Sequence, residues 1–423
     1  MNVYIETHGC KLNIADSQKI SKEILSKGFS ISDDLEKSDI YILNTCTVTK
    51  SADKKARNRL RNIKKNHPKI HLVATGCYPQ RNESEIQSLG IVDTVIKNDK
   101  KNQLPIVLSN KFFKETRSES DPVIEDLLIG RTRASIAIQK GCNQICSYCI
   151  VPKVRGRENS IHPDEIISQI NYLVSKGCKE VVLTGTQLGT YGYDLDNMSL
   201  YRLLLSVLEQ TQIIRLRLSS VQPHEFNDDI IGLWKNKKYK DRLCPHFHIP
   251  LQSGSNNILK SMRRKYSTQE FLEIVKHIKT IIPNSSITSD IIVGFPGETE
   301  EDHNRTKKLL KISELSEIHV FPYSVRPGTS AFYLKDKVQS SVITKRAKEI
   351  RNISNDLKNK HMQSLLNTDQ NVLWENKNSL SGYTENYTYF SLSKSTNKKP
   401  TLPITKVKVK SIEDDNLVGI ISI

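Results

Sequence analysis

The sequence predicts an α/β protein in three parts: an N-terminal parallel α/β domain, a central partial barrel of the TIM type with about six β/α units, and a small C-terminal all-β domain with an OB-like barrel. Three patterns support this prediction. Apolar strand-like runs alternate with amphipathic helix-like runs near the N-terminus, which indicates a parallel sheet with right-handed crossovers. The same unit recurs along the middle of the chain, and the C-terminal residues form mostly strand-like runs.

The N-terminal domain is expected over residues 1–112. Its strands alternate with helices, and the second helix is strongly basic. The strands are expected at 2–7, 39–45 and 70–75, and the helices at 14–28 and 51–68. The next segment, 113–130, is charged, contains Ser and Pro and has no clear period, so a linker is expected there.

The central domain repeats a strand–helix unit, and its helices begin with recognisable caps. Pro163 suits a first helical turn. Ser267 with Glu270 has capping-box spacing, and Thr299 with Asp302 is a close variant. Because barrel sites lie at the C-terminal ends of the strands, ligands are expected there. The domain is expected over 131–358, with strands at 135–141, 180–185, 214–220, 246–252, 286–295 and 317–324.

The C-terminal domain is expected over 361–423, after a helical stretch around 340–366. In the run KVKVK, Val407 and Val409 alternate with lysines that include Lys408. Alternation with period two places one face of a strand against the core and the other toward water, so a basic outer face is expected. The strands are expected at 371–375, 386–393, 405–412 and 416–423.

Charge and hydropathy restrict the partners of the chain. Its 423 residues include 63 Lys and Arg against 46 Asp and Glu, for a net charge of +17. This excess indicates a polyanionic partner, most plausibly nucleic acid, although a composition rich in Lys, Asn and Ile would also produce it. No apolar run approaches the ~20 residues that span a bilayer, and the N-terminus lacks signal-peptide features. We therefore expect a cytoplasmic protein that makes no membrane contact.

The eight cysteines contain one compact group. Cys142, Cys146 and Cys149 have CxxxCxxC spacing. In a reducing compartment such thiols are more often ligands than disulfides, and soft thiolates select iron–sulfur clusters or zinc. A closed structural zinc site needs four ligands, and no fourth Cys or His lies close in sequence. Three thiolates on a four-iron cluster would leave one iron open, while zinc or a purely structural cluster stays the alternative.

A second group is dispersed along the N-terminal domain. Cys10, Cys46 and Cys77 each follow one of the expected strands. The carboxyl ends of parallel strands meet at one edge of a sheet, where ligands bind in folds of this kind. The spacing therefore predicts a joint three-thiolate site, and three buried structural cysteines are the alternative.

The compact group resembles the cluster motif of the radical S-adenosylmethionine superfamily. The resemblance implies that S-adenosylmethionine chelates the open iron, and that its reductive cleavage yields a 5′-deoxyadenosyl radical. Later strand ends match the superfamily's cofactor contacts, although each could also be an ordinary βα turn. The positions implied as contacts to S-adenosylmethionine are Thr184, Gly185, Ser219, Val293 and Gly294.

Further strings narrow the resemblance to the methylthiotransferase family of radical enzymes. They are THGCKLN, LNTCTVT, ATGCYPQ, CSYCIVPKVRGRENS, PLQSGSNNILKSMRRKY, IVGFPGET and FPYSVRPGTSA, in order along nearly the whole chain. The resemblance implies a methylthiotransferase domain, a radical core and a C-terminal TRAM domain. It implies that the dispersed cysteines hold an auxiliary 4Fe-4S cluster and that the compact ones hold the radical 4Fe-4S cluster. Cys178 and Cys244 match neither set, so core positions are expected for them.

The substrate expected from the resemblance is a modified adenosine in tRNA. THGCKLN is similar to the branch that acts on threonylcarbamoyladenosine, although His8 stands where that branch more often has Leu, and FPYSVRPGT fits a tRNA branch. We therefore expect transfer of a methylthio group to C2 of N6-threonylcarbamoyladenosine at position 37. Isopentenyladenosine at the same position is one alternative. A non-catalytic RNA-binding protein with structural metal sites is another.

Contacts to the anticodon stem-loop are expected from basic and aromatic residues. The basic helix between Lys50 and Lys69 could track phosphates, or could simply be a solvated face. Aromatic rings of the C-terminal domain could stack on unpaired bases. The candidate contacts are Arg155, Arg157, Tyr383, Tyr387 and Lys408. The radical chemistry implied by the resemblance also needs an electron donor such as flavodoxin or ferredoxin.

Overall fold

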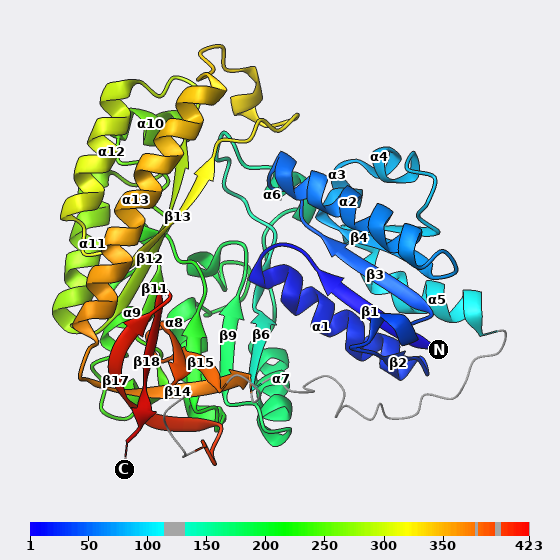
Figure 1. Cartoon of the computed structure of the whole chain (residues 1–423), viewed down its shortest axis with the longest axis horizontal. Coiled ribbons are helices and arrows are strands. Elements are labelled where there is room, and N and C mark those ends of the chain that lie inside the picture. The colour runs from blue at the N-terminus through cyan, green and yellow to red at the C-terminus, as the bar shows by residue number, and fades with distance from the viewer. Residues whose placement is uncertain (114–131, 377–379, 394–398, 423) are drawn as a thin grey trace. The chain divides into compact units, whose positions relative to one another are not determined.

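The computed structural model describes residues 1–113, 132–376, 380–393 and 399–422 (Figure 1). The expected linker falls almost wholly outside these residues. The chain forms two compact units. Unit one contains the described residues up to Phe113 together with Gln139–Asn159 and Ser324–Phe332, and unit two contains the remaining described residues. The expected boundaries followed sequence order, whereas these units draw two later segments into the N-terminal one.

Unit one is built on a five-stranded parallel sheet of order β2-β1-β3-β4-β5. The three expected strands match β1, β3 and β4 to within one residue, whereas the short edge strands β2 and β5 were not expected. The strands are β1 Asn2–Thr7, β2 Ser30–Ile31, β3 Ile40–Thr45, β4 His71–Gly76 and β5 Thr94–Lys97. The helices are α1 Lys11–Ser26, α2 Lys50–Asn66, α3 Cys77–Arg81, α4 Glu83–Gln87, α5 Leu104–Phe112 and α6 Val151–Arg155.

The central strand β3 is buried on both faces. Ile40 and Ile42 pack with α1 and α5, while Tyr41 and Leu43 pack with α2 on the opposite face. Successive strand side chains point to opposite faces, and a near-continuous apolar run is what a doubly covered parallel strand requires. The two cores fix the sheet, and thereby its carboxyl edge, where the N-terminal cysteines lie.

Unit two contains six parallel strands in chain order. Three form the sheet β10-β9-β6 and three the sheet β11-β12-β13, and the bridges Leu216↔Leu243 and Ser220↔His248 join them. The expected partial barrel is thus present. The strands are β6 Arg133–Ala137, β9 Glu180–Thr184, β10 Arg215–Leu218, β11 His246–His248, β12 Ser286–Val293 and β13 Glu317–Pro322. The short strands β7 Gln139–Lys140 and β8 Asn159–Ser160 form a separate two-stranded sheet.

The helices between the strands begin where the caps were expected. Pro163 lies in the first turn of α7, and the Ser267 hydroxyl accepts a hydrogen bond from Glu270 N while the Glu270 carboxylate accepts one from Ser267 N. Thr299 and Asp302 form the same reciprocal pair. The helices are α7 Pro163–Ser175, α8 Leu200–Gln210, α9 Asp228–Gly232, α10 Asn256–Ser261, α11 Thr268–Ile281, α12 Glu300–Ile312 and α13 Ser340–Ser364.

The C-terminal strands close into a small barrel of order β14-β15-β16-β18-β17. Val407 and Val409 are fully buried in it and Lys408 is exposed, as the alternation predicted. The single strand expected at 386–393 was wrong in extent, because Tyr387 adopts a left-handed φ of 68° and turns the chain between β15 and β16. The strands are β14 Asp369–Asn376, β15 Ser381–Thr384, β16 Tyr389–Leu392, β17 Ile404–Glu413 and β18 Asn416–Ile421.

Among the described residues, no helix is both long enough and apolar enough to cross a bilayer.

Candidate functional site

The three dispersed cysteines lie at the carboxyl ends of neighbouring strands, as predicted. Cys10 follows β1 and caps α1, Cys46 follows β3, and Cys77 begins α3 directly after β4. Strands β1, β3 and β4 are adjacent in the sheet. The sheet edge therefore brings together residues that stand more than sixty positions apart in sequence.

Asn13, in the first turn of α1, is a common neighbour of Cys10 and Cys77. Its Oδ1 lies 3.8 Å from the Cys10 sulfur and 4.0 Å from the Cys77 sulfur. A Cβ on Gly9, which has a left-handed φ of 121°, would lie 2.8 Å from both Cys46 Cβ and Asn13 Nδ2. Only glycine fits there, so the loop before Cys10 packs directly onto Cys46. The sequence analysis did not single out Asn13.

The surroundings of these thiols suit a metal cluster. Cys77 is 4% exposed. Burial raises the pKa of Cys46 to about 11 and raises that of Cys77 as well. Burial thus favours the neutral thiol at Cys46 and Cys77, and a bound metal would stabilise the thiolates that serve as ligands. Three convergent soft sulfurs without a fourth fit an iron–sulfur cluster with one open iron.

The compact cysteines occupy a loop of unit one that closes upon itself. Cys142 N donates to Gly156 O at 3.2 Å, and Cys149 N donates to Cys146 O at 3.1 Å. A Cβ on Gly141 would lie 1.9 Å from Arg157 O, so glycine is required where the two ends of the loop meet. Gln144 N donates to the Cys142 sulfur at 3.3 Å. These backbone hydrogen bonds hold the three cysteines in one closed loop.

The segment Ser324–Phe332 belongs to unit one and contacts both cysteine regions. Ala331 N donates to Ser147 O at 2.7 Å, inside the compact loop. The Arg326 guanidinium lies 2.5 Å from Asp53, and Arg81 shares that carboxylate. Asp53 also accepts from Thr47, next to Cys46. The sequence analysis used this segment only as a motif and did not predict its contact with the N-terminal domain.

The two arginines after the compact cysteines differ in environment. Arg157 is exposed, as a phosphate contact requires. The Arg155 side chain is only 5% exposed and its guanidinium lies 3.0 Å from Asp16, so it is not available to a phosphate. The expectation that Arg155 binds tRNA is therefore corrected: the guanidinium is turned into the N-terminal domain by a buried carboxylate.

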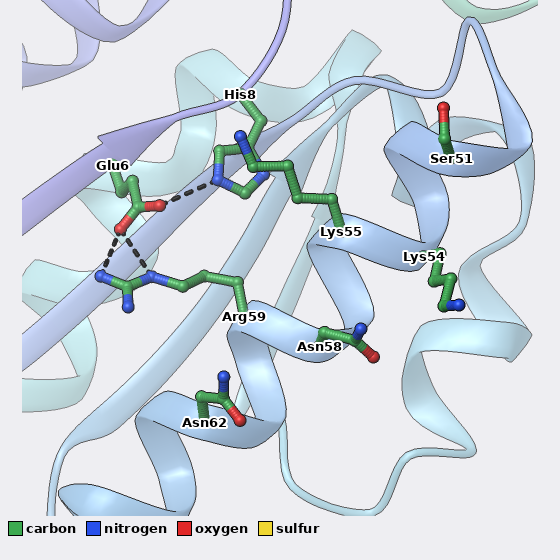
Figure 2. Close-up of a pocket in the computed structure, with 8 residues that line it drawn as sticks. All are labelled: Glu6, His8, Ser51, Lys54, Lys55, Asn58, Arg59 and Asn62. Atoms are coloured by element: carbon green, nitrogen blue, oxygen red, sulfur yellow. Dashed lines mark hydrogen bonds and ion pairs between the residues drawn. The ribbon is translucent and has the colours of Figure 1, made fainter.

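A pocket of about 530 Å³ opens along the basic helix α2 (Figure 2). Glu6 accepts hydrogen bonds from His8 at 2.8 Å and from Arg59 at 2.8 Å. Burial would raise the pKa of Glu6, but His8, Arg59 and Tyr41 outweigh it and lower that pKa to about 2. His8 Nδ1 is buried and has no hydrogen-bond partner in the described structure. The lining residues are Glu6, His8, Ser51, Lys54, Lys55, Asn58, Arg59 and Asn62.

The residues expected to contact S-adenosylmethionine lie at the strand ends of unit two. Thr184 ends β9 and Ser219 follows β10. Ser219 Oγ is buried without a hydrogen-bond partner among the described residues, which suits a site completed by a ligand. Gly294 has a left-handed φ of 74°, and a Cβ there would lie 2.3 Å from the Ile343 side chain. Local packing therefore requires glycine at this position, whether or not a cofactor binds. Val293 is buried at the end of β12, and Gly185 is partly buried after β9.

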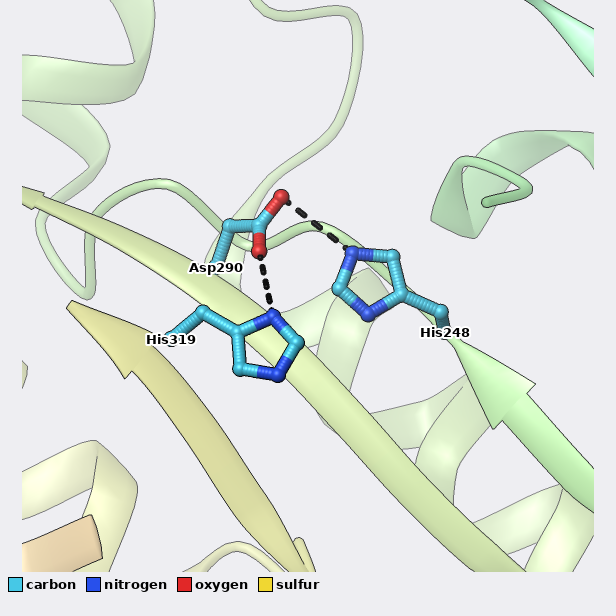
Figure 3. Close-up of side chains that lie close together, drawn as sticks. All are labelled: His248, Asp290 and His319. Atoms are coloured by element: carbon cyan, nitrogen blue, oxygen red, sulfur yellow. Dashed lines mark ion pairs between the residues drawn. The ribbon is translucent and has the colours of Figure 1, made fainter. Parts of the chain in front are cut away.

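A cluster of two histidines and a carboxylate lies on the strands β11, β12 and β13 (Figure 3). Asp290 Oδ2 lies 3.2 Å from His248 Nε2, and Asp290 Oδ1 lies 3.4 Å from His319 Nδ1. Burial would raise the pKa of Asp290, but the two histidines outweigh it and hold it below its usual range. The spacing suits two hydrogen bonds to one carboxylate, or three ligands of one divalent cation. The HFH run was its only sequence signal.

The C-terminal tyrosines are engaged within unit two. Tyr383 and Tyr387 stack on one another at 4.7 Å, and the Arg133 guanidinium lies 5.1 and 5.2 Å from their ring centres. Arg217 lies 4.7 Å from the Tyr387 ring. Both tyrosines are half-buried, so these contacts hold the rings in place, and their role in stacking on bases stays a prediction. Lys408 stays exposed on the outer face of β17.

Cys178 and Cys244 are 2% and 1% exposed, as expected for core thiols. The Cys178 sulfur donates to the Glu180 carbonyl at 3.3 Å.

Comparison with known proteins places these features in a family. Residues 136–310 match the radical SAM superfamily model and residues 2–97 match the model described as uncharacterized protein family UPF0004. The threonylcarbamoyladenosine tRNA methylthiotransferase MtaB of Bacillus subtilis is 35% identical over 409 residues, covering 91% of this chain and 89% of that protein. This chain belongs to the radical S-adenosylmethionine methylthiotransferase family.

Other members of the family differ in the nucleoside that they modify. MtaB of Aquifex aeolicus is 35% identical over 89% of this chain and 95% of that protein. The tRNA-2-methylthio-N(6)-dimethylallyladenosine synthase of Clostridium tetani is 36% identical over 90% of this chain and 88% of that protein. Membership of the family means that the chain is a tRNA-modifying radical enzyme that uses S-adenosylmethionine and 4Fe-4S clusters.

Solved structures of lower identity share the fold. The radical S-adenosylmethionine methyltransferase TsrM of Kitasatospora setae aligns with a TM-score of 0.56 at 14% identity, over 78% of this chain and 76% of that one. The S-adenosylmethionine radical enzyme OxsB aligns with a TM-score of 0.51 at 9% identity, over 85% of this chain and 56% of that one. Both confirm the architecture predicted from the alternation of strands and helices.

Proposed function

We propose that this enzyme transfers a methylthio group to C2 of N6-threonylcarbamoyladenosine at position 37 of tRNA, using two 4Fe-4S clusters. The observation that carries the proposal is the convergence of Cys10 and Cys77 on Asn13, with Cys46 packed against the same loop. A second three-thiol site, besides CxxxCxxC, is what separates sulfur transfer from simpler radical chemistry. The string THGCKLN and the two MtaB relatives favour the threonylcarbamoyl substrate.

In this proposal each cysteine group holds one cluster. The dispersed group holds the auxiliary cluster, on which sulfur is carried, and Cys142, Cys146 and Cys149 hold the cluster that binds S-adenosylmethionine. The bound S-adenosylmethionine supplies the 5′-deoxyadenosyl radical. Thr184, Gly185, Ser219, Val293 and Gly294 are proposed to contact this cofactor, and the unsatisfied hydroxyl of Ser219 offers a hydrogen bond to it.

The tRNA is proposed to meet exposed basic residues of both units. The α2 pocket presents the exposed side chains of Lys54 and Lys55, two cations that suit a phosphate. Arg157 and Lys408 are exposed in units one and two, respectively. We propose a cytoplasmic location, which a tRNA substrate supports, and flavodoxin or ferredoxin as the electron donor.

Nucleoside mass spectrometry of tRNA from a deletion strain tests the substrate. We expect the methylthio group to disappear from threonylcarbamoyladenosine and to return when the wild-type gene is restored. A strain complemented with Cys10→Ala should not recover it. If the deletion strain keeps the methylthio group on threonylcarbamoyladenosine and loses it from isopentenyladenosine, then isopentenyladenosine is the substrate.

Isopentenyladenosine is the alternative substrate. It is supported by the dimethylallyladenosine synthase of Clostridium tetani, which is as similar to this chain as the MtaB proteins are. Anaerobic incubation with dithionite and S-adenosylmethionine tests the enzyme class separately. Formation of 5′-deoxyadenosine is expected for either substrate. Its absence from cluster-loaded protein would favour an RNA-binding protein with structural metal sites.

A further inference from the structure

The side chains of His248, Asp290 and His319 meet on the inner face of the partial barrel (Figure 3). Asp290 lies directly opposite His319 in the register of β12 and β13, and His248 lies opposite the residue two positions before Asp290. Residues two apart on a strand share a face, so all three lie on one face of adjacent strands. The opposite face packs outward, because Phe247, next to His248, contacts Trp234 just after α9.

The spacing of these side chains matches the ligands of one metal ion. Asp290 lies 3.2 Å from His248 Nε2 and 3.4 Å from His319 Nδ1. Charge-assisted hydrogen bonds to carboxylates are about 2.7–2.9 Å long, as in the pair His277 and Asp228 at 2.9 Å. Two ligands at about 2.0–2.1 Å from one tetrahedral zinc ion lie roughly 3.3 Å apart. The distances in the cluster therefore fit a shared cation better than they fit two strong hydrogen bonds.

The ring of His248 is also held on its far side. Its Nδ1 lies 2.9 Å from Thr288 Oγ1, which directs Nε2 toward Asp290. A histidine that binds a metal almost always makes a hydrogen bond through its other ring nitrogen, and that bond fixes the tautomer and the orientation of the ring. Thr288 therefore provides the supporting contact that a metal-binding histidine requires.

The cluster is accessible to a ligand. The His319 side chain is 49% exposed, and that of Asp290 is 23% exposed. Among the described residues, the group contains no fourth histidine, cysteine or carboxylate. Structural zinc sites have four protein ligands, whereas catalytic sites have three and keep an open position. Two histidines and one carboxylate with open positions also bind other divalent transition cations.

We propose that His248, Asp290 and His319 bind one divalent transition cation, and that zinc is the cation that their spacing fits best. The site is separate from both cysteine groups, because no cysteine belongs to it. The open position of the cation faces the barrel interior, where an oxygen or nitrogen atom of a bound molecule completes the coordination. The proposal goes beyond the proposed function and does not rest on it.

Elemental analysis of the full-length, cluster-loaded enzyme tests the site. The enzyme is incubated anaerobically with zinc chloride, separated from unbound metal by gel filtration, and analysed for zinc and iron together. We expect one zinc per chain in the wild type, with the iron content unchanged. His319→Ala and Asp290→Asn each remove one ligand and should lose the bound zinc. His277→Ala is the matched control and should keep it, because His277 and Asp228 form an exposed pair outside the group of three.

Thr288→Val tests the contact that orients His248, since valine has a similar shape but no hydroxyl group. Loss of a supporting contact weakens metal affinity about 10–100-fold. We expect a decrease of this size when the variant competes for zinc with a chromophoric chelator. A residue that contributed only to folding would change the stability of the protein and leave the zinc affinity of the folded enzyme unchanged.

A wild-type enzyme that binds no zinc would overturn the proposal, as would zinc that persists in both His319→Ala and Asp290→Asn. Zinc that binds only as iron is lost would place the metal at the cysteines and would also overturn it. Wild-type zinc affinity in Thr288→Val would have the same consequence. If Asp290→Asn does not fold, His319→Ala decides, because the half-exposed His319 side chain can be shortened without opening the core.

Discussion

Two residues, Asn13 and Gly9, shape the surroundings of the N-terminal cysteines. Asn13 is 1% exposed and links the loop before Cys10, the end of β3 and two sulfurs. Gly9 has no Cβ because Cys46 occupies that space. These two residues fix how the loop before Cys10 packs against Cys46 and Cys77 at the sheet edge.

Replacing Asn13 with Ala should both destabilise unit one and loosen the site. The carbonyls of His8 and Thr45 would lose their buried donor, at about 1–3 kcal/mol for each unsatisfied group. We expect a lower urea midpoint and a fall in bound iron. Asn58→Ala, an exposed position on α2, is the control. Full iron loading and wild-type stability in Asn13→Ala would contradict this account.

His361 should make stability depend on pH. Burial, assisted by Lys279, lowers its pKa to about 4, and its Nε2 contacts Thr388 Oγ1 at 3.0 Å. Since the folded pKa lies below the ordinary value near 6.5, the stability contributed by neutral His361 is complete above pH 6.5 and is lost as pH falls toward 4. Between pH 7 and 5 the loss is about 2 kcal/mol.

His361→Gln tests this sign, because glutamine keeps a donor but does not titrate. Urea unfolding of both proteins should show wild type losing about 2 kcal/mol more than the variant between pH 7 and 5. Parallel losses in the two proteins would assign the pH dependence to other groups.

At the scale of elements, the strands and helices position the candidate functional side chains. β1, β3 and β4 each end at a cysteine, and α2 carries basic residues along one pocket. The buried face of α2, which includes Leu60 and Ile63, holds the helix on the sheet. The opposite face is therefore free to carry charge without affecting the core.

Charge removal on α2 should weaken tRNA binding without unfolding the protein. In Lys54→Gln/Lys55→Gln, both changes fall on exposed positions. We expect weaker tRNA affinity and a salt dependence shallower by roughly one to two units of log–log slope. Filter binding across a salt series measures both. The control is Lys235→Gln/Lys237→Gln, an exposed pair in unit two with the same change of net charge. Equal effects of the two pairs would indicate a general charge effect only.

At the scale of the whole molecule, unit one is assembled from three separate stretches of the chain. Gln139–Asn159 and Ser324–Phe332 join the N-terminal domain, and Arg155 and Arg326 each contribute a buried ion pair to it. Both cysteine groups therefore belong to one compact unit, although they come from different regions of the sequence.

The two groups should nevertheless load independently, because they share no cysteine. Cys10→Ala should lower bound iron by about one four-iron cluster and leave reductive cleavage of S-adenosylmethionine intact. Iron analysis and 5′-deoxyadenosine formation measure the two properties. Cys178→Ala, a buried thiol outside both groups, is the control for loss of a cysteine as such. Loss of both clusters in Cys10→Ala would show that the groups are not separable.

The sequence alone predicted the three long strands of the N-terminal domain, the six strands of the central domain, the helix caps and the position of Cys10, Cys46 and Cys77 after strands, because periodicity and capping are local properties. The sequence motifs spread along the chain also indicated the family. The tertiary structure decided which side chains are available. Arg155 was expected to contact RNA, but its buried guanidinium is paired with Asp16. Such pairings join residues far apart in sequence, and no local pattern encodes them. Asn13 and the His248–Asp290–His319 cluster also emerged only where distant strands met.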